Sequence, residues 1–351
     1  MRPASPGCPN PRTACDRQYQ TRSEIMTEEH PFTSYVRTLG RGKTSSRNLT
    51  QQEAHDAMRL IMQGDVHREQ LGAFLMLLRV KEETAEELAG FCTGVQAAWT
   101  PLPERSVDID WSCYAGKKRQ LPWLVLVQLL LSELGYRQCI HGTRGHTPGR
   151  LYVQDVYAEL GFPVLPSRTE LDAWDPSDLA FLPLSVLAPR LEEIIQLRHI
   201  LGLRSPVHSF CRLLNPFAAP TVLQAIFHPG YHVLHQGAAA LLNYPVSLVI
   251  KGDSGEFERN PHADLTLYWA RGSQTEETTL PRVFSERAER PETLDIRDLV
   301  QVWRGEARDR YGEAAVIHTL TLALMAHLTL AEPEARMQAE VAWQERNRSL
   351  L

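Results

Sequence analysis

The sequence predicts an α/β protein in which a helical N-terminal domain precedes a larger α/β domain with a mostly parallel central sheet. Three observations favour this class. Residues 33–100 carry apolar side chains at helical spacing only. After the prolines at 101 and 103, short β-like runs alternate with helical segments, which is typical of a parallel sheet covered on both faces. Residues 293–350 return to helical spacing.

The composition is typical of soluble globular proteins. The chain has 351 residues, enough for two domains, with 43% hydrophobic and 23% charged residues. The longest apolar run, over 121–131, contains Pro122 and Gln128 and is too short to cross a bilayer, so no membrane association is expected. Six cysteines form no C-x-x-C pair and no secretory segment is recognised, which favours reduced thiols and a cytoplasmic location.

The first hundred residues divide into an extension and a helical domain. Residues 1–25 are rich in Pro, Arg and Ser without apolar periodicity, so a disordered extension is predicted. The helical domain is expected over 26–100. Two T-x-x-E capping boxes mark helix starts within it: Thr50 with Glu53, and Thr84 with Glu87. So many apolar faces in a short segment predict further packing, and a homodimer contact is expected there.

Residues 101–351 are expected to form the α/β domain. Helices are predicted over 121–134 and near 151–160, 190–201, 221–227 and 229–243. Strands are predicted over 136–142, 162–167, 181–187, 247–252 and 265–270. Three further helices are expected between residues 293 and 350.

Basic loops that carry glycine are candidate anion sites. AGKKRQLPW, at 115–123, opens a helix, whose first N–H groups and positive dipole end favour anions. HGTRGHTPGR, at 141–150, follows a predicted strand, and its glycines let a ligand approach the backbone. Together with the loop at 40–46 and the segment at 198–212, these loops supply the candidate phosphate- or nucleic-acid-binding residues: Arg41, Lys43, Lys117, Lys118, Arg119, His141, Arg144, Arg150 and Arg204.

Two other patterns, a P-loop-like stretch and three spaced histidines, do not predict the sites that they resemble. GRGKTSS, at 40–46, is not predicted to be a nucleotide P-loop, because Arg37 stands where that motif requires its first glycine and a helix-like run precedes it. The histidines at 228, 232 and 235 are spaced for one helical face, but no acid or cysteine completes a zinc site.

An acidic loop, KGDSGEFERNP at 251–261, follows the strand predicted over 247–252. Oxygen atoms of Asp253, Glu256 and Glu258 could hold Mg²⁺. The carboxyl end of a strand is also where open α/β sheets bind their ligands. The alternative is a loop that simply faces solvent.

The order of these segments resembles the anthranilate phosphoribosyltransferase family, glycosyltransferase family 3. LGLRSPVHSFCRLLNP resembles its G-x-R-T…L-L-N-P stretch, with Arg204 and Ser205 at the R-T positions. His141-Gly142 matches its K-H-G-N loop, and KGDSGEFERNP matches its acidic metal loop. The resemblance implies a nucleoside phosphorylase/phosphoribosyltransferase-like fold and a homodimer through the helical domain. It also implies that the helix near 190–201 packs with that domain.

Departures from the family pattern bear on function. The family's pyrophosphate loop, G-T-G-G-D, reads YAGKKRQ here, and its D-E magnesium pair reads Phe257-Glu258, which leaves Glu258 as a weak metal ligand. The early GRGK stretch, the basic loop and Asn260-Pro261 are similar to the YbiB-like branch of the family. That resemblance implies nucleic-acid binding.

We therefore expect sequence-tolerant binding of single-stranded DNA or RNA, without a cofactor, as the main function. The formal net charge of −5, taken alone, argues against a dedicated nucleic-acid binder, since such proteins are usually basic. The alternative is a pentosyl (phosphoribosyl) transferase acting on a phosphorylated donor with an altered substrate, using Mg²⁺ with His141, Arg204 and Glu258. A third possibility is a scaffold that kept the fold and lost the chemistry. Trp111, Tyr114 and Trp123 are expected in the core rather than stacked on bases.

Overall fold

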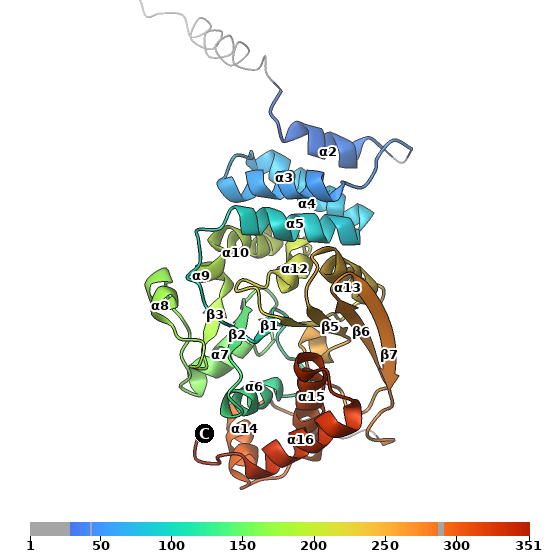
Figure 1. Cartoon of the computed structure of the whole chain (residues 1–351). Coiled ribbons are helices and arrows are strands. Elements are labelled where there is room, and N and C mark those ends of the chain that lie inside the picture. The colour runs from blue at the N-terminus through green and yellow to red at the C-terminus, as the bar shows by residue number, and fades with distance from the viewer. Residues whose placement is uncertain (1–28, 43, 287–290) are drawn as a thin grey trace, which may run out of the picture.

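The structure is a computed structural model that describes residues 29–42, 44–286 and 291–351. The predicted extension at 1–25 lies outside the described residues, as does Lys43. Four helices form a stack at one end of the molecule (Figure 1). They are α2 (Thr33–Gly40), α3 (Gln51–Gln63), α4 (Arg68–Lys81) and α5 (Ala85–Ala97). Both predicted capping boxes are present, at the starts of α3 and α5, which confirms these helix starts.

Helices from the middle of the chain lie directly under α5 (Figure 1). They are α10 (Pro189–Gln196) and α12 (Val207–Phe210), and the short α11 (Arg198–Leu201) follows α10 in the chain. Leu191 and Ile194 of α10 belong to the same buried cluster as the apolar faces of α3 to α5. The ring of Phe210 lies 5.6 Å from that of Phe91 on α5. The helical end of the molecule is therefore built from two separate stretches of sequence.

The α/β part is a seven-stranded sheet in the order β3-β2-β1-β4-β5-β6-β7. The first five strands in this order pair in parallel, and β6 and β7 are antiparallel, so the mostly parallel sheet is confirmed. The strands are β1 (Ile109–Cys113), β2 (Gln138–Gly142), β3 (Phe181–Pro183), β4 (Thr221–Ala225), β5 (Val246–Ile250), β6 (Leu265–Arg271) and β7 (Gln274–Leu280).

Helices cover both faces of the sheet. On one face, α13 (Tyr231–Leu241) packs on β5 and β6 and contacts α5. On the other, α15 (Arg310–Leu328) packs against α6 (Leu124–Glu133) and reaches β4 and β5. The remaining elements are α7 (Val153–Glu159), α8 (Arg168–Ala173), α9 (Leu184–Leu187), α14 (Ile296–Arg304), α16 (Glu332–Glu345), and the 3-10 turns η1 (Cys211–Leu213) and η2 (Asp253–Gly255).

Three sequence predictions of single elements were wrong. The helix predicted near 221–227 is β4, a central strand whose residues are all buried. Continuous burial removes the alternation that would mark a strand, so a helix and a strand could not be told apart. The strand predicted over 162–167 contributes only an isolated bridge, and the one over 181–187 divides into β3 and α9. The strands at β1 and β7 were not predicted.

Candidate functional site

A cavity of about 280 Å³ lies where the helical stack meets the carboxyl ends of β1, β4 and β5. We call it the arginine cavity. It is lined by Arg79, Arg204 and Arg212 together with His146, His208 and Tyr231. These residues come from α4, from the loop after β2, from the segment around α12 and from the start of α13. The position agrees with the general rule that parallel sheets bind ligands beyond the carboxyl ends of their strands.

The guanidinium groups in this cavity repel one another. Burial, and then repulsion from Arg198, Arg150 and Arg212, lowers the pKa of Arg204 to about 10. Within the described part of the chain, neither Arg204 nor Arg212 has a carboxylate at ion-pair distance. Arg212 is nearly buried and donates to the carbonyl oxygen of His208. Several cations without an acidic partner make a site that an anion would stabilise.

Two histidines face the same space without adding charge to it. The rings of His146 and His208 lie 5.1 Å apart. Burial is the largest cause that lowers the pKa of His146 to about 4 and that of His208 to about 2, and the nearby arginines lower both further. The Nε2–H of His146 donates to the Tyr114 carbonyl oxygen over 2.7 Å. Within the described residues, the buried Nε2 of His208 has no hydrogen-bond partner.

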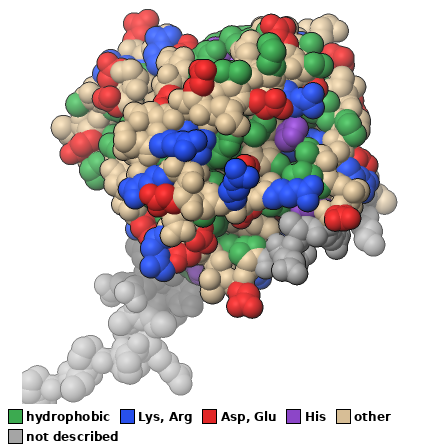
Figure 2. Space-filling model, turned by 90° about the horizontal axis from the view of Figure 1, so that it is seen from below, with side chains coloured by type: hydrophobic (Ala, Val, Ile, Leu, Met, Phe, Trp, Pro, Cys, Tyr) green, Lys and Arg blue, Asp and Glu red, His purple; other side chains and the backbone are tan. Residues whose placement is uncertain are grey.

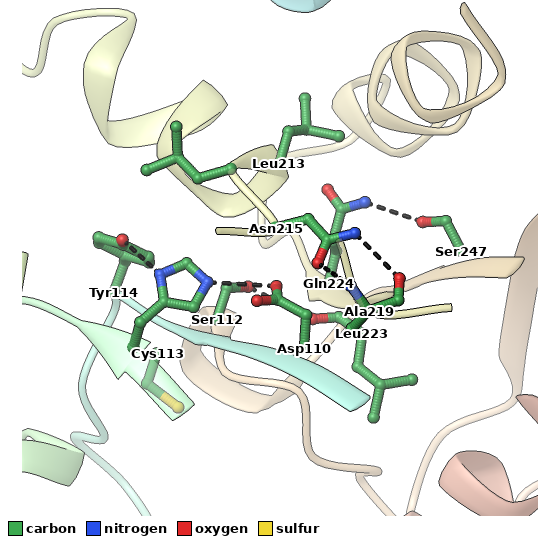
Figure 3. Close-up of polar contacts among 12 residues, drawn as sticks. Asp110, Ser112, Cys113, Tyr114, Leu213, Asn215, Ala219, Leu223, Gln224 and Ser247 are labelled. Carbon is green, nitrogen blue, oxygen red and sulfur yellow. Dashed lines mark hydrogen bonds and ion pairs between the residues drawn. The ribbon is translucent and has the colours of Figure 1, made fainter. Parts of the chain in front are cut away.

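A hydrogen-bonded chain ends at Ser209, which also lines the cavity. His235 lies between Ser209 Oγ (2.8 Å from Nε2) and Gln224 Oε1 (2.9 Å from Nδ1). Gln224 in turn donates from Nε2 to Ser247 Oγ over 2.9 Å (Figure 3). Because Gln224 Oε1 can only accept, His235 carries its proton on Nδ1 and accepts the Ser209 proton at Nε2. The Ser209 oxygen is thereby left as an acceptor for a ligand.

His141 lies below the cavity rather than in it. Tyr114 donates its hydroxyl proton to His141 Nδ1 over 2.8 Å, and His141 Nε2 lies 3.2 Å from Asp110 Oδ1 (Figure 3). All three side chains are buried. The prediction that His141 binds phosphate directly is therefore wrong: its contacts hold Tyr114, whose ring lies under the Arg212 guanidinium.

The predicted basic and acidic loops bind each other. Lys117 Nζ is 2.5 Å from Glu258 Oε1 and also contacts Asp253, and Lys117 has no exposed surface. Glu256 Oε1 accepts from the backbone N–H groups of Ala115 (2.7 Å) and Gly116 (2.5 Å). The prediction that Lys117 contacts an external phosphate is therefore wrong, because the nearest opposite charges are the chain's own carboxylates.

Glu258 does not fit a magnesium ligand. One carboxylate oxygen is engaged by Lys117, and the other accepts from Leu124 N at the start of α6 over 2.9 Å. The same contact corrects the prediction that the N-terminus of this helix is open to a ligand anion. Phe257 is buried against Trp111, with ring centroids 5.4 Å apart, so it supplies no oxygen either. With a lysine ammonium already between the carboxylates, the residues present do not fit a divalent cation.

The other predicted cations are dispersed. Arg204 is the predicted residue that lines the cavity. Arg150 donates to the carbonyl oxygens of Ala115, Gly116 and Ser254, so it ties the basic loop to the acidic loop. The remaining described cations are exposed, and one of them is paired with Asp155: Arg41, Lys118, Arg119 and Arg144.

Sequence reasoning missed several cavity residues. Arg79, His208 and Arg212 were not selected. The usable signal was the run from Arg198 to Arg212, which carries three arginines and no acid. Trp111, Tyr114 and Trp123 are buried, as predicted, and are not available to stack on bases. No helix within the described residues is long and apolar enough to cross a membrane.

Comparisons with known proteins bear on the family and the fold. The helical bundle domain of the glycosyl transferase family matches residues 33–98. An uncharacterized protein of Aquifex aeolicus is 30% identical over 241 residues, which cover 68% of this chain and 73% of that protein. The chain belongs to glycosyltransferase family 3.

The relatives of this chain include both enzymes and uncharacterized proteins. The uncharacterized protein YbiB of Escherichia coli is 27% identical over 242 residues, covering 66% of this chain and 73% of YbiB. An anthranilate phosphoribosyltransferase of Lactococcus lactis is 27% identical over 220 residues, covering 62% of this chain and 65% of the enzyme. The Saccharomyces cerevisiae enzyme in complex with PRPP and Mg has the same fold. Its TM-score is 0.73 at 16% identity, with 92% of this chain and 96% of that chain covered.

Proposed function

We propose that this family 3 protein is a pentosyltransferase-type protein that binds a phosphorylated pentose donor in the arginine cavity, with the phosphate on Arg204 and Arg212. The observation that carries the proposal is the convergence of guanidinium groups on a cavity in which, among the described residues, neither of these two has a carboxylate partner. Relatives that are anthranilate phosphoribosyltransferases support a phosphorylated pentose as the ligand class.

The cavity offers complementary groups for the rest of such a ligand. Arginine binds phosphate through planar, charge-assisted hydrogen bonds. Ser209 presents an oxygen that accepts, and the buried Glu83 carboxyl, which also lines the cavity, accepts from the Tyr231 hydroxyl over 2.9 Å. Burial raises the pKa of Glu83 above that of an exposed carboxyl. A sugar phosphate has both an anion for the arginines and hydroxyl groups for these acceptors.

Calorimetry with ribose 5-phosphate and phosphoribosyl pyrophosphate tests the proposal. Arg204→Gln is a suitable variant because, within the described residues, the Arg204 guanidinium makes one long hydrogen bond, 3.4 Å to Thr147, so little folding energy is lost with it. Arg144→Gln is the matched control, since Arg144 is exposed and does not line the cavity. We expect affinity to fall at least about tenfold in Arg204→Gln, the loss of one charged hydrogen bond, and to be unchanged in the control. Titrations of the parent that release no heat with either ligand would refute the proposal.

A second candidate is the backbone of a single-stranded nucleic acid. It is supported by Lys118 and Arg119, which are exposed and have no ion pair within the described residues. The face formed by α14 to α16 does not favour it, because acidic and basic side chains alternate there (Figure 2). Fluorescence anisotropy with a labelled oligonucleotide should show binding that weakens with salt and is lost in Lys118→Ala/Arg119→Ala. Arg282→Ala, at an exposed arginine paired with Asp264, is the control.

Assembly into a homodimer through the helical end stays a proposal. Val80 on α4 and Ile200 on α11 expose about four fifths of their surfaces, at 83% and 80%. Burying such side chains in a partner interface would be favourable. Analytical ultracentrifugation at micromolar concentration separates a monomer from a dimer, and Ile200→Glu should favour the monomer.

A further inference from the structure

Two consecutive backbone N–H groups after β1 point at one carboxylate oxygen. Ala115 N and Gly116 N both donate to Glu256 Oε1. Gly116 has a φ of +66°, and a Cβ there would come within 3.1 Å of the Tyr152 ring. Successive N–H groups in such a turn form a concave anion site. The anion in this one is supplied by the chain itself, from the loop that follows β5.

A cation is supplied in the same way, one residue further on. Lys117 Nζ lies between the carboxylates of Asp253 and Glu258, and Lys117 and Glu258 have no exposed surface. Burial acts to lower the pKa of Lys117, but the two carboxylates outweigh it, so the pKa is raised and the ammonium stays charged. Two carboxylate groups that converge on one buried point are the kind of oxygen ligands that Mg²⁺ and Mn²⁺ use.

We propose that Lys117 and Glu256 are internal replacements for a divalent cation and for the anionic group that such a cation would hold. This part of the sheet edge then binds neither a divalent cation nor an external anionic group from solution. This inference rests on the proposed function. A ligand bound by Arg204 and Arg212 then needs no metal, and no metal-bound diphosphate can occupy the turn at Ala115 and Gly116.

Titration with Mn²⁺, followed by electron paramagnetic resonance, tests the replacement directly. The parent should bind no stoichiometric Mn²⁺ at pH 8, whereas Lys117→Ala should gain one site per chain, because removing the lysine leaves the buried Glu258 and the partly exposed Asp253 without a cation between them. Lys117→Arg keeps a cation and should gain no site. Lys117→Ala/Glu258→Gln should lose the gained site. Equal Mn²⁺ binding by the parent and a folded Lys117→Ala, checked by circular dichroism, would overturn the proposal.

A second measurement needs no variant. Ribose 5-phosphate should bind the parent with the same affinity, within about twofold, in excess chelator and in excess Mg²⁺. An increase in affinity of tenfold or more with Mg²⁺ would overturn the internal replacement. If ribose 5-phosphate does not bind under either condition, the proposed function fails, and the Mn²⁺ titration still decides the role of Lys117.

Discussion

Lys117→Met should destabilise the fold in a way that depends on pH. The substitution removes a cation that contacts two carboxylates and keeps a side chain of similar length. Breaking a buried ion pair by deleting one partner costs about 3–5 kcal/mol. That is a large fraction of the roughly 5–15 kcal/mol by which proteins are stable. The neighbouring Lys118 is exposed, so Lys118→Met should change the free energy of unfolding by less than about 0.5 kcal/mol.

The sign of the pH effect follows from Glu258. Burial is the main cause that raises its pKa to about 7 in the folded parent, and Lys117 acts in the opposite direction. A carboxyl whose folded pKa exceeds its unfolded value loses stability as pH rises through that interval. Without Lys117 the folded pKa rises further. Above pH 7 the variant therefore keeps losing about 1.4 kcal/mol per pH unit after the parent has levelled off.

Urea unfolding at pH 6 and pH 8 measures both quantities. The difference in unfolding free energy between the parent and Lys117→Met should be larger at pH 8 by about 1 kcal/mol or more. A difference below about 1 kcal/mol at pH 8, or one that does not change with pH, would show that Lys117 is not the partner of these carboxylates.

Four further variants test other parts of the structure. Ser209→Ala should weaken ribose 5-phosphate about fivefold and leave inorganic phosphate unchanged in calorimetry, because it removes an acceptor for a hydroxyl group; equal losses for both ligands would contradict this. The lowered pKa of His146, about 4, makes the parent lose stability as pH falls below 6.5. His146→Gln should therefore lose about 2 kcal/mol less between pH 7 and pH 5 in urea unfolding, and an unchanged loss would contradict it. Gly142→Ala would place a Cβ 1.8 Å from the Cys113 carbonyl oxygen and should destabilise by at least about 3 kcal/mol. Gly72→Ala, on an open face of α4, should stabilise by about 0.5–1 kcal/mol in the same assay.

Local patterns in the sequence predicted the elements whose signals lie within a few residues. The capping boxes at Thr50 and Thr84 each join residues three positions apart, so the sequence alone determines where α3 and α5 begin. The apolar segment at 121–134 was predicted as a helix, and it forms α6 over Leu124–Glu133. The central strand β4 was not predicted, because burial on both faces erases its alternation. The exposed, polar β7 has no apolar pattern at all.

The sequence by itself determined which loops carry charge, and that the loops at 141–150 and 251–261 follow strands. Only the tertiary structure decided what each charge meets. Lys117 and Glu258 are 141 residues apart in the sequence. The strands β1 and β5 both pair with β4 in parallel, so the loops that follow β1 and β5 lie at the same edge of the sheet. Within the described residues Arg204 has no carboxylate partner, and its side chain lines the arginine cavity. A charged side chain on a loop pairs with an opposite charge that lies close to it in space, because the attraction falls with distance. The position of a residue in the sequence does not reveal which opposite charge will lie close to it.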